Sequence, residues 1–325
     1  MSRLLIATGL VLGLAGAASA QKFLATNNLA ATNGFTADGA DQLITMDFAT
    51  AAWGPVSGDG GIRVGGVTPV NGISGLDFDH TTGKLYGCTA FGSVPGNFYE
   101  INPATGVATL LGPTGVLMND LSWDPVSKTM YGTAGGALYK VSLVNGATSL
   151  VGAYSVAGFL EVGLGFDSTG HVIVHDLVFD TIYRGTAPGS TTLAVLHAIG
   201  YNSNFSQGTF VDWTTNIGYH AAIDGGALSA PNYRFTMVPG SYVLASTFPL
   251  HTNGLPVVEV GDLTMLLKKG CYADCEGDGD LDVFDFLCFQ SEWANQTAYG
   301  DCEGDGDWDV FDFLCFQSEY ANGCP

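Results

Sequence analysis

The chain has 325 residues, a formal net charge of −21 and only ten Lys and Arg residues. Such an acidic balance repels polyanions and therefore argues against a role in binding nucleic acid. The length allows more than one domain, and changes in composition divide the chain into residues 1–20, 21–268 and 269–325.

Residues 1–20 have the features of a secretory signal peptide. Arg3 supplies a positive charge, Leu4 to Leu14 form an apolar stretch, and Ala18-Ser19-Ala20 is a small-residue cleavage site. The apolar stretch is too short to span a bilayer, and no later segment is long and apolar enough to be a transmembrane segment. We therefore expect cleavage after Ala20 and a mature protein that is secreted, either extracellular or associated with a cell surface.

Residues 21–268 contain a weak repeat made of strand-like units. The first unit, GLDFDHTTGKLYG, spans residues 75–87, recurs at 120–132, and returns in shortened or degraded form at 163–170 and from Thr209. Alternating apolar residues predict a strand, the Asp and Gly that follow predict a turn, and Lys-Leu-Tyr predicts the returning strand. Each copy therefore reads as a β-hairpin.

A second hairpin unit accompanies the first and sets the expected number of repeats. Its five copies begin at Leu43, Phe98, Leu138, Ile182 and Tyr233. Two hairpins make a four-stranded blade, and a period of roughly 40–50 residues is typical of propellers. The sequence predicts an all-β propeller of about five blades, with six as the alternative. Lys22 to Thr26 should start the first blade, and Leu255 to Val260 should return to close it.

The propeller segment contains no convincing catalytic set. It lacks H-E-x-x-H and G-x-S-x-G motifs, and its six His residues are scattered. His171 and His175, with Asp176 and Asp180 nearby, could bind a metal ion, although strand and turn positions at a rim explain them more simply. The D-x-x-[TS]-G-x-[LM]-Y pattern resembles that of divergent secreted propellers, and this likeness implies a fold and no particular ligand.

Recurring acids and one isolated thiol in this segment have structural explanations. Asp79, Asp124 and Asp167 occupy the same place in successive repeats, which predicts a role in capping turns and not in catalysis. Cys88 reads as a small buried apolar residue, the alternative being a reactive thiol. The sequence therefore favours a non-catalytic protein.

Residues 269–325 contain one acidic segment written twice. DCEGDGDLDVFDFLCFQSEW begins at Asp274, and DCEGDGDWDVFDFLCFQSEY begins at Asp301. In an EF-hand-like loop of twelve residues, Ca²⁺ takes oxygen ligands from positions 1, 3, 5, 7, 9 and 12, and Gly stands at position 6. Gly279 and Gly306 fall at position 6. The predicted ligands of two Ca²⁺ ions are Asp274, Glu276, Asp278, Asp280 (backbone carbonyl), Asp282 and Asp285, and Asp301, Glu303, Asp305, Asp307 (backbone carbonyl), Asp309 and Asp312.

The last 55 residues hold 14 acidic side chains and no Lys or Arg, so folding of this segment should be linked to metal. They also hold six of the seven cysteines, which predicts a disulfide framework in an exported protein. The symmetry of the repeat favours Cys275–Cys288 with Cys302–Cys315, or the crossed pairs. Cys271 and Cys324 would then pair and join the two ends. A zinc site is the less favoured alternative.

The tandem loops, with Asp and not Glu at position 12, resemble dockerin domains, the calcium-dependent docking modules of secreted polysaccharide-degrading complexes. The two DCEGDGDxDVFDFLCF blocks and the terminal Gly-Cys-Pro are most similar to the cysteine-containing, GC-type dockerins of secreted planctomycete proteins. The resemblance covers residues 271–325. It implies a small α-helical module, a cohesin-like or cell-surface partner, and partner contacts at loop positions 10 and 11, which are Val283, Phe284, Val310 and Phe311.

Each block also carries more apolar residues than one helical stripe can bury, so some of them should face a partner. We therefore expect a secreted, non-catalytic binding protein. Its C-terminal module would bind two Ca²⁺ and dock it to a cell-surface or extracellular complex, and its propeller would bind a glycan or a protein. The alternative is an extracellular polysaccharide-degrading enzyme, a glycoside hydrolase or lyase, carried by the same module.

Overall fold

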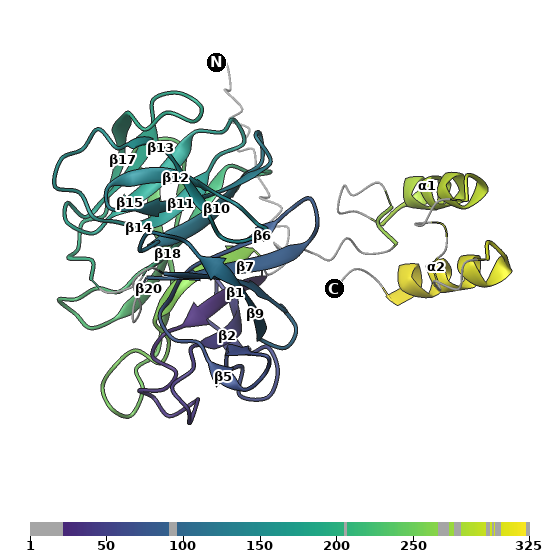
Figure 1. Cartoon of the computed structure of the whole chain (residues 1–325), viewed down its shortest axis with the longest axis horizontal. Helices are drawn as coiled ribbons and strands as arrows, with labels where there is room; N and C mark the ends of the chain where they lie inside the picture. The colour runs from purple at the N-terminus through teal and green to yellow at the C-terminus, as the bar shows by residue number, and fades with distance from the viewer. Residues whose placement is uncertain are drawn as a thin grey trace, which may run out of the picture.

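The computed structural model describes residues 22–90, 96–204, 207–265, 273–275, 281–296, 300, 302 and 307–322. Residues 1–20, the predicted signal peptide, lie outside this range. Within the described residues the chain forms strands β1 to β22, followed by helices α1 and α2 (Figure 1). No helix among them is long and apolar enough to cross a membrane.

The strands form five sheets, which are the blades of a propeller (Figure 1). The first blade consists of β22 (Val260–Met265), β1 (Lys22–Asn27), β2 (Gln42–Asp47) and β3 (Trp53–Pro55). The second consists of β6 (Ile73–Asp79), β7 (Lys84–Thr89), β8 (Asn97–Ile101) and β9 (Val107–Pro113), extended by β4 (Arg63–Val64) and β5 (Thr68–Pro69). The expected all-β propeller of five blades is confirmed, and the alternative of six is not.

The other three blades each have four strands. The third contains β10 (Asp120–Asp124), β11 (Thr129–Ala134), β12 (Ala137–Val141) and β13 (Thr148–Ala153). The fourth contains β14 (Glu161–Phe166), β15 (Val172–Asp176), β16 (Thr181–Gly185) and β17 (Leu193–Ala198). The fifth contains β18 (Gly208–Asp212), β19 (Ile217–Ala221), β20 (Ala230–Thr236) and β21 (Tyr242–Phe248). Strands β22, β6, β10, β14 and β18 contact one another in that order and are the innermost strands.

The ring closes by pairing the last strand with the first. β22 runs antiparallel to β1, with Phe23 opposite Met265 and Leu24 opposite Thr264. The first blade starts at Lys22, as expected. The closing strand is β22, Val260–Met265, and the prediction of Leu255 to Val260 is wrong. Pro256 has no N–H to donate to a strand ladder, and it lies instead in an isolated bridge with Leu250.

The turns that follow the innermost strands have the predicted chemistry. Asp79 Oδ1 accepts a hydrogen bond from Thr81 N at 2.9 Å, and Asp124 Oδ1 accepts one from Val126 N at 3.0 Å. Asp167 Oδ1 likewise accepts one from Thr169 N at 2.9 Å. Each Asp therefore satisfies the backbone donors of its own turn, and the recurrence of these acids needs no catalytic explanation.

Three other acids link neighbouring blades around the axis. Asp262 Oδ2 accepts a hydrogen bond from Leu76 N, Asp77 Oδ2 from Trp123 N, and Asp120 Oδ2 from Leu164 N, at 2.5, 2.7 and 2.5 Å. All three carboxyl groups are buried. Because each bond joins one innermost strand to the next, the carboxyl groups hold the ring together where no sheet hydrogen bond crosses between blades.

The C-terminal segment is helical. α1 spans Val283–Ala294 and α2 spans Val310–Asn322. The rings of Phe289 and Phe316 stack with centroids 4.2 Å apart, and both side chains are fully buried. This stack joins the two helices, which lie side by side (Figure 1). The expected small helical module after the propeller is therefore present.

Candidate functional site

The described ends of the two acidic loops have the same local structure. Asp282, at loop position 9, caps α1 by accepting Phe284 N at 2.7 Å, and Asp309 caps α2 by accepting Phe311 N at 2.7 Å. The residue at position 12 bonds back to the cap, because Asp285 Oδ2 accepts a hydrogen bond from Asp282 N at 2.8 Å. Asp312 Oδ2 accepts Asp309 N at the same distance. Each loop thus ends in a capping box that fixes its position-12 carboxylate at a helix N-terminus.

The second carboxylate oxygen of Asp285, Oδ1, bears on whether the first loop suits a cation. Asp285 is fully buried, and its Oδ1 has no hydrogen-bond partner among the described residues. A buried carboxylate oxygen without a partner is costly, and Ca²⁺ is a hard cation that binds such oxygens. The corresponding oxygen of Asp312 accepts Cys302 N at 2.9 Å. The first loop therefore retains a buried oxygen suited to an ion.

Six of the twelve predicted calcium ligands are among the described residues: Asp274, Asp282, Asp285, Asp307, Asp309 and Asp312. The other six lie outside them: Glu276, Asp278, Asp280, Asp301, Glu303 and Asp305. In the part of the chain that is described, no three His, Cys, Asp or Glu side chains gather closely enough to hold a metal ion. The structure thus describes half of the predicted ligands. These six residues all carry carboxylate or carbonyl oxygens, the donors that Ca²⁺ prefers.

In each repeat, one disulfide attaches the loop to the helix that follows it. Cys275 bonds to Cys288 with Cα atoms 5.7 Å apart, and Cys302 bonds to Cys315 with Cα atoms 5.9 Å apart. Of the two pairings that the sequence left open, the structure has the one within each repeat. Cys271 and Cys324 lie outside the described residues. Cys88 is buried and free, and burial raises the pKa of its thiol, as befits an unreactive core residue.

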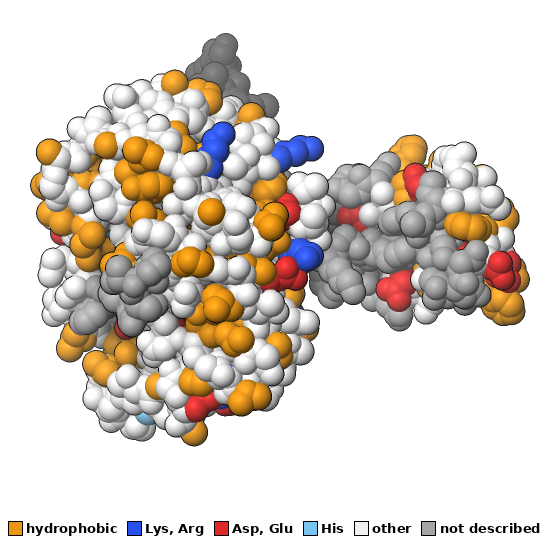
Figure 2. Space-filling model, in the orientation of Figure 1, with side chains coloured by type: hydrophobic (Ala, Val, Ile, Leu, Met, Phe, Trp, Pro, Cys, Tyr) orange, Lys and Arg blue, Asp and Glu red, His pale blue; other side chains and the backbone are white. Residues whose placement is uncertain are grey.

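The helices expose apolar side chains at equivalent places in the two repeats. We call this set the apolar face: Val283, Phe284, Leu287, Val310, Phe311 and Leu314. The exposed fractions are 63%, 57% and 53% on α1 and 62%, 55% and 53% on α2. Figure 2 shows hydrophobic side chains on the surface of the helices. The face includes all four predicted partner-contact residues, and it adds Leu287 and Leu314. Exposed apolar clusters of this kind mark interaction sites.

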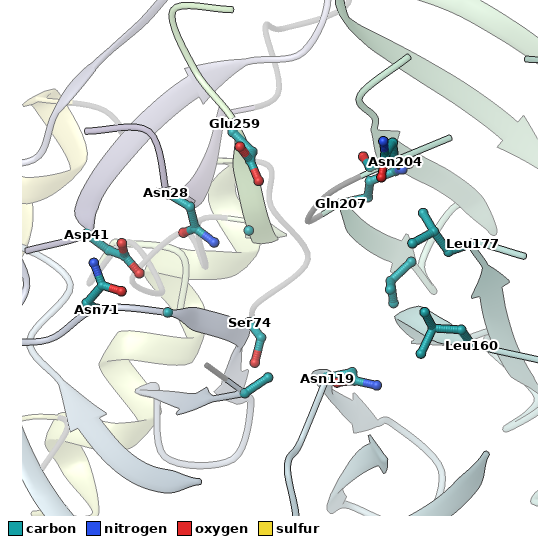
Figure 3. Close-up of a pocket in the computed structure, with 14 residues that line it drawn as sticks. Asn28, Asp41, Asn71, Ser74, Asn119, Leu160, Leu177, Asn204, Gln207 and Glu259 are labelled. Carbon is teal, nitrogen blue, oxygen red and sulfur yellow. Dashed lines mark hydrogen bonds between the residues drawn. The ribbon is translucent and has the colours of Figure 1, made fainter. Parts of the chain in front are cut away.

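A second candidate site is a cavity of about 520 Å³ in the propeller (Figure 3). Its wall is formed largely by residues in or near the loops that lead into the innermost strands. Asn71 precedes β6, Asn119 precedes β10, Leu160 precedes β14, Gln207 precedes β18, and Glu259 precedes β22. All five blades thus contribute to one cavity. Asp41, which lies beside β2, also lines it.

Asp41 has a strongly perturbed carboxyl group in this wall. Its side chain is buried, and Oδ2 accepts a hydrogen bond from Ile73 N at 2.7 Å. Burial raises the pKa of Asp41, backbone hydrogen bonds oppose the shift, and the nearby Glu259 carboxylate adds a small rise, so that the pKa is about 7. Asp41 can therefore either donate or accept a proton near neutral pH.

The cavity residues belong to none of the motifs that the sequence makes conspicuous. Those motifs fall in the turns after the innermost strands, whereas the cavity lies at the other end of these strands. A signal existed, because Asn119, Gln207 and Glu259 each stand directly before an innermost strand. Only the closed ring shows that these positions converge.

The suggested histidine metal site is not assembled. His171 lies at the blade surface, where its Nδ1 contacts Thr169 Oγ1 at 2.7 Å and Arg184 Nη2 at 3.2 Å. His175 is fully buried between blades, with its ring centroid 4.3 Å from that of His220. These two histidines and the neighbouring Asp176 and Asp180 are all described, and they form no metal-binding group.

Comparison with known proteins finds only distant likenesses, all of them among solved structures. No protein-family model matches the chain, and no curated protein matches it. Among solved structures, the chain is similar to one in a crystal structure of a nidogen/laminin complex, with 11% identity, a TM-score of 0.44, and coverage of 69% of this chain and 77% of the other. It is also similar to TolB from Acinetobacter baumannii, with 13% identity, a TM-score of 0.46, and coverage of 71% and 54%. Similarities this low say nothing about function.

Proposed function

We propose that this protein is a secreted, non-catalytic binding protein that docks through residues 269–325. This dockerin-like module would bind two Ca²⁺ ions and attach the propeller to a cohesin-like or cell-surface protein. The observation that carries the proposal is the buried Asp285 carboxylate, whose Oδ1 has no partner among the described residues, next to the exposed Phe284. In the second repeat the predicted ion ligand Asp312 likewise follows the exposed Phe311.

Calcium would act by neutralising and ordering the loops. Residues 271–325 of the module hold 14 acidic residues and no Lys or Arg, so without a cation its loops repel one another. A bound Ca²⁺ supplies positive charge to the carboxylates at positions 1, 3, 5, 9 and 12. Asp285 and Asp312 belong to both a loop and a helix N-terminus, so they would transmit the ordering of the loop to α1 and α2. The apolar face would then be held in one arrangement for a partner.

The export that docking requires is supported by chemistry in two parts of the chain. Residues 1–20 have the pattern of a signal peptide, and disulfides such as Cys275–Cys288 and Cys302–Cys315 persist in oxidising compartments. We therefore place the mature protein outside the cell or at its surface.

Affinity capture tests the docking function. The mature protein, immobilised, is exposed to the secreted and surface proteins of the producing organism, once in Ca²⁺ and once in chelator. We expect a partner that is retained only in Ca²⁺, is lost with the double variant Phe284→Ala/Phe311→Ala, and is kept by the control Val144→Ala. Val144 is an apolar residue of the propeller surface that is 84% exposed. A bound set that is the same with and without Ca²⁺ would refute the proposal.

A polysaccharide-degrading enzyme is the second candidate, and one observation favours it. Asp41, with a pKa of about 7, lines the same cavity as Glu259. Two carboxyl groups facing one cavity are the minimum that a glycosidase needs. Incubation of the mature protein with a panel of polysaccharides, followed by a reducing-sugar assay, decides between the candidates. Turnover that Asp41→Asn and Glu259→Gln both abolish would establish an enzyme.

A further inference from the structure

We propose that the propeller cavity is a binding site for a neutral, polyhydroxylated ligand the size of one or two sugar rings. This inference goes beyond docking, because every described residue that lines the cavity belongs to the propeller. Its volume of about 520 Å³ lies in the range of small-molecule sites. The chemistry of the wall identifies the ligand class.

Two amide side chains present hydrogen-bond acceptors from neighbouring blades. Asn71 Nδ2 donates to Gly39 O at 2.9 Å, and Asn119 Nδ2 donates to Glu161 O at 3.0 Å. These bonds fix both amide groups. Within the described part of the chain, neither Oδ1 atom accepts a hydrogen bond. Each oxygen is therefore available to accept a hydrogen bond from a ligand hydroxyl group.

A third amide, Gln207, is held from behind by a buried network. Its Oε1 lies 2.9 Å from His220 Nε2, and its Nε2 donates to Asn204 O at 3.0 Å. His220 Nδ1 in turn lies 2.7 Å from Tyr242 Oη. Burial keeps the pKa of His220 well below its usual range, so the ring is neutral, and Nε2 can donate while Nδ1 accepts. The network pre-organises Gln207 at the cavity wall.

The charges of the wall exclude an anionic ligand. Asp41 and Glu259 line the cavity, and none of the lining residues that the structure describes is Lys, Arg or His. Carboxyl groups accept hydrogen bonds from hydroxyl groups, and they repel phosphate, sulfate or uronate groups. The net charge of −21 adds to this repulsion. A neutral ligand with many hydroxyl groups fits this wall.

The opposite wall is apolar, and it argues against a bare cation as the occupant. Leu160, Val162 and Leu177 of the fourth blade line this side. Figure 3 shows Leu160 and Leu177 across the cavity from Asp41 and Asn71. A metal ion gains nothing from apolar side chains, because they offer no ligand atoms. A sugar ring can pack its C–H face on leucine while its hydroxyl groups reach the amide and carboxyl groups.

Direct binding measurements test the proposal. Labelled mature protein is applied to an array of neutral oligosaccharides, with matched uronate and sulfated oligosaccharides on the same surface and spermine as a cationic probe in solution. We expect binding of at least one neutral class, confirmed by calorimetry, and weak or no binding of the anionic sugars. Binding should be equal in Ca²⁺ and in chelator, so failure of the docking function would leave this result intact.

Cavity variants and matched controls locate the site. Leu160 is 43% exposed at the cavity wall and Leu150 is 64% exposed on β13, so Leu160→Trp should abolish sugar binding and Leu150→Trp should not. Asn71→Ala should weaken binding by about tenfold, the effect of losing one or two hydrogen bonds. Its control is Asn145→Ala, whose amide also makes a single backbone hydrogen bond, but in a turn outside the cavity. Thermal melts identify any variant that fails to fold.

Three results would overturn the proposal. The first is binding of no neutral sugar on the array. The second is binding of anionic sugars or spermine in preference to neutral ones. The third is unchanged sugar affinity in folded Leu160→Trp and Asn71→Ala, which would place the sugar site elsewhere on the molecule.

Discussion

The imidazole rings of His175 and His220 lie with their centroids 4.3 Å apart at the contact between the fourth and fifth blades. His175 is fully buried, and neither ring nitrogen has a hydrogen-bond partner among the described residues. Burial lowers the pKa of His175 to about 3. Burial, and then the neighbouring His175, lower the pKa of His220 as well. Both rings are therefore neutral in the folded protein.

This pair predicts sensitivity to acid. Because the folded-state pKa of His175 is below the unfolded value of about 6.5, its contribution to stability is present above pH 6.5 and falls as the pH drops towards 3. Between pH 6.5 and 4.5 the loss should be roughly 2 kcal/mol for this one residue. Urea unfolding at both pH values should show a smaller loss in His175→Phe than in the unaltered protein. Equal losses in the two proteins would contradict the burial of a neutral ring.

Asp41 predicts the opposite dependence on pH. Its folded-state pKa of about 7 is above the unfolded value, so its contribution to stability is present below about pH 4 and is lost as the pH rises through 7. Asp41→Asn should therefore remove part of any decline in unfolding free energy between pH 5 and 8, by roughly 2 kcal/mol. The measurement is urea unfolding at pH 5 and 8. An unchanged pH dependence in the variant would show that Asp41 is not protonated in the fold.

The calcium loops can be tested one ligand at a time. Asp285→Asn replaces one oxygen of the predicted first site and keeps the side-chain shape, so Ca²⁺ affinity at that site should fall by at least about tenfold. Calorimetric titration should then show one tight site in place of two. Glu319→Gln is the control, because Glu319 is an exposed acid of α2 that lies outside both loops. Two tight sites in Asp285→Asn would remove Asp285 from the ligand set.

Metal and disulfides should support the module jointly. Cys275–Cys288 and Cys302–Cys315 attach the loops to the helices, so the oxidised protein should keep its helical circular dichroism when Ca²⁺ is chelated. The reduced, chelated protein should lose it, because nothing then offsets the repulsion among the loop carboxylates. A helical signal that persists after both treatments would disprove the link between metal and folding.

The phenylalanines of α1 should separate stability from docking. Phe289 is fully buried against Phe316, and Phe284 is 57% exposed. Phe289→Ala should destabilise the helical module by about 3–5 kcal/mol, whereas Phe284→Ala should leave its stability almost unchanged. Calcium-dependent partner capture should be lost in a folded Phe284→Ala/Phe311→Ala protein. Equal destabilisation by the two single substitutions would mean that Phe284 belongs to the core.

Much of the fold was predictable because its signals are local. Asp79 and Gly83 specify a turn through bonds and a positive φ within a few residues, and the same pattern recurs along the chain. Two such hairpins per repeat were enough to predict five blades. The acidic loops could be predicted from the sequence for the same reason, since every predicted ligand of each ion lies within twelve consecutive residues.

What the tertiary structure alone decided depends on contacts between residues far apart in the chain. The closing strand begins at Val260 and not at Leu255, because pairing with β1 selects its register. Asn71, Asn119 and Gln207 meet at one cavity only once the ring has closed. The amino-acid sequence by itself thus determined the turns and the repeats, which form by short-range hydrogen bonding, and it predicts the calcium loops for the same reason. The packing of distant strands decided which side chains line the axis, because loop closure brings together residues that local patterns do not relate.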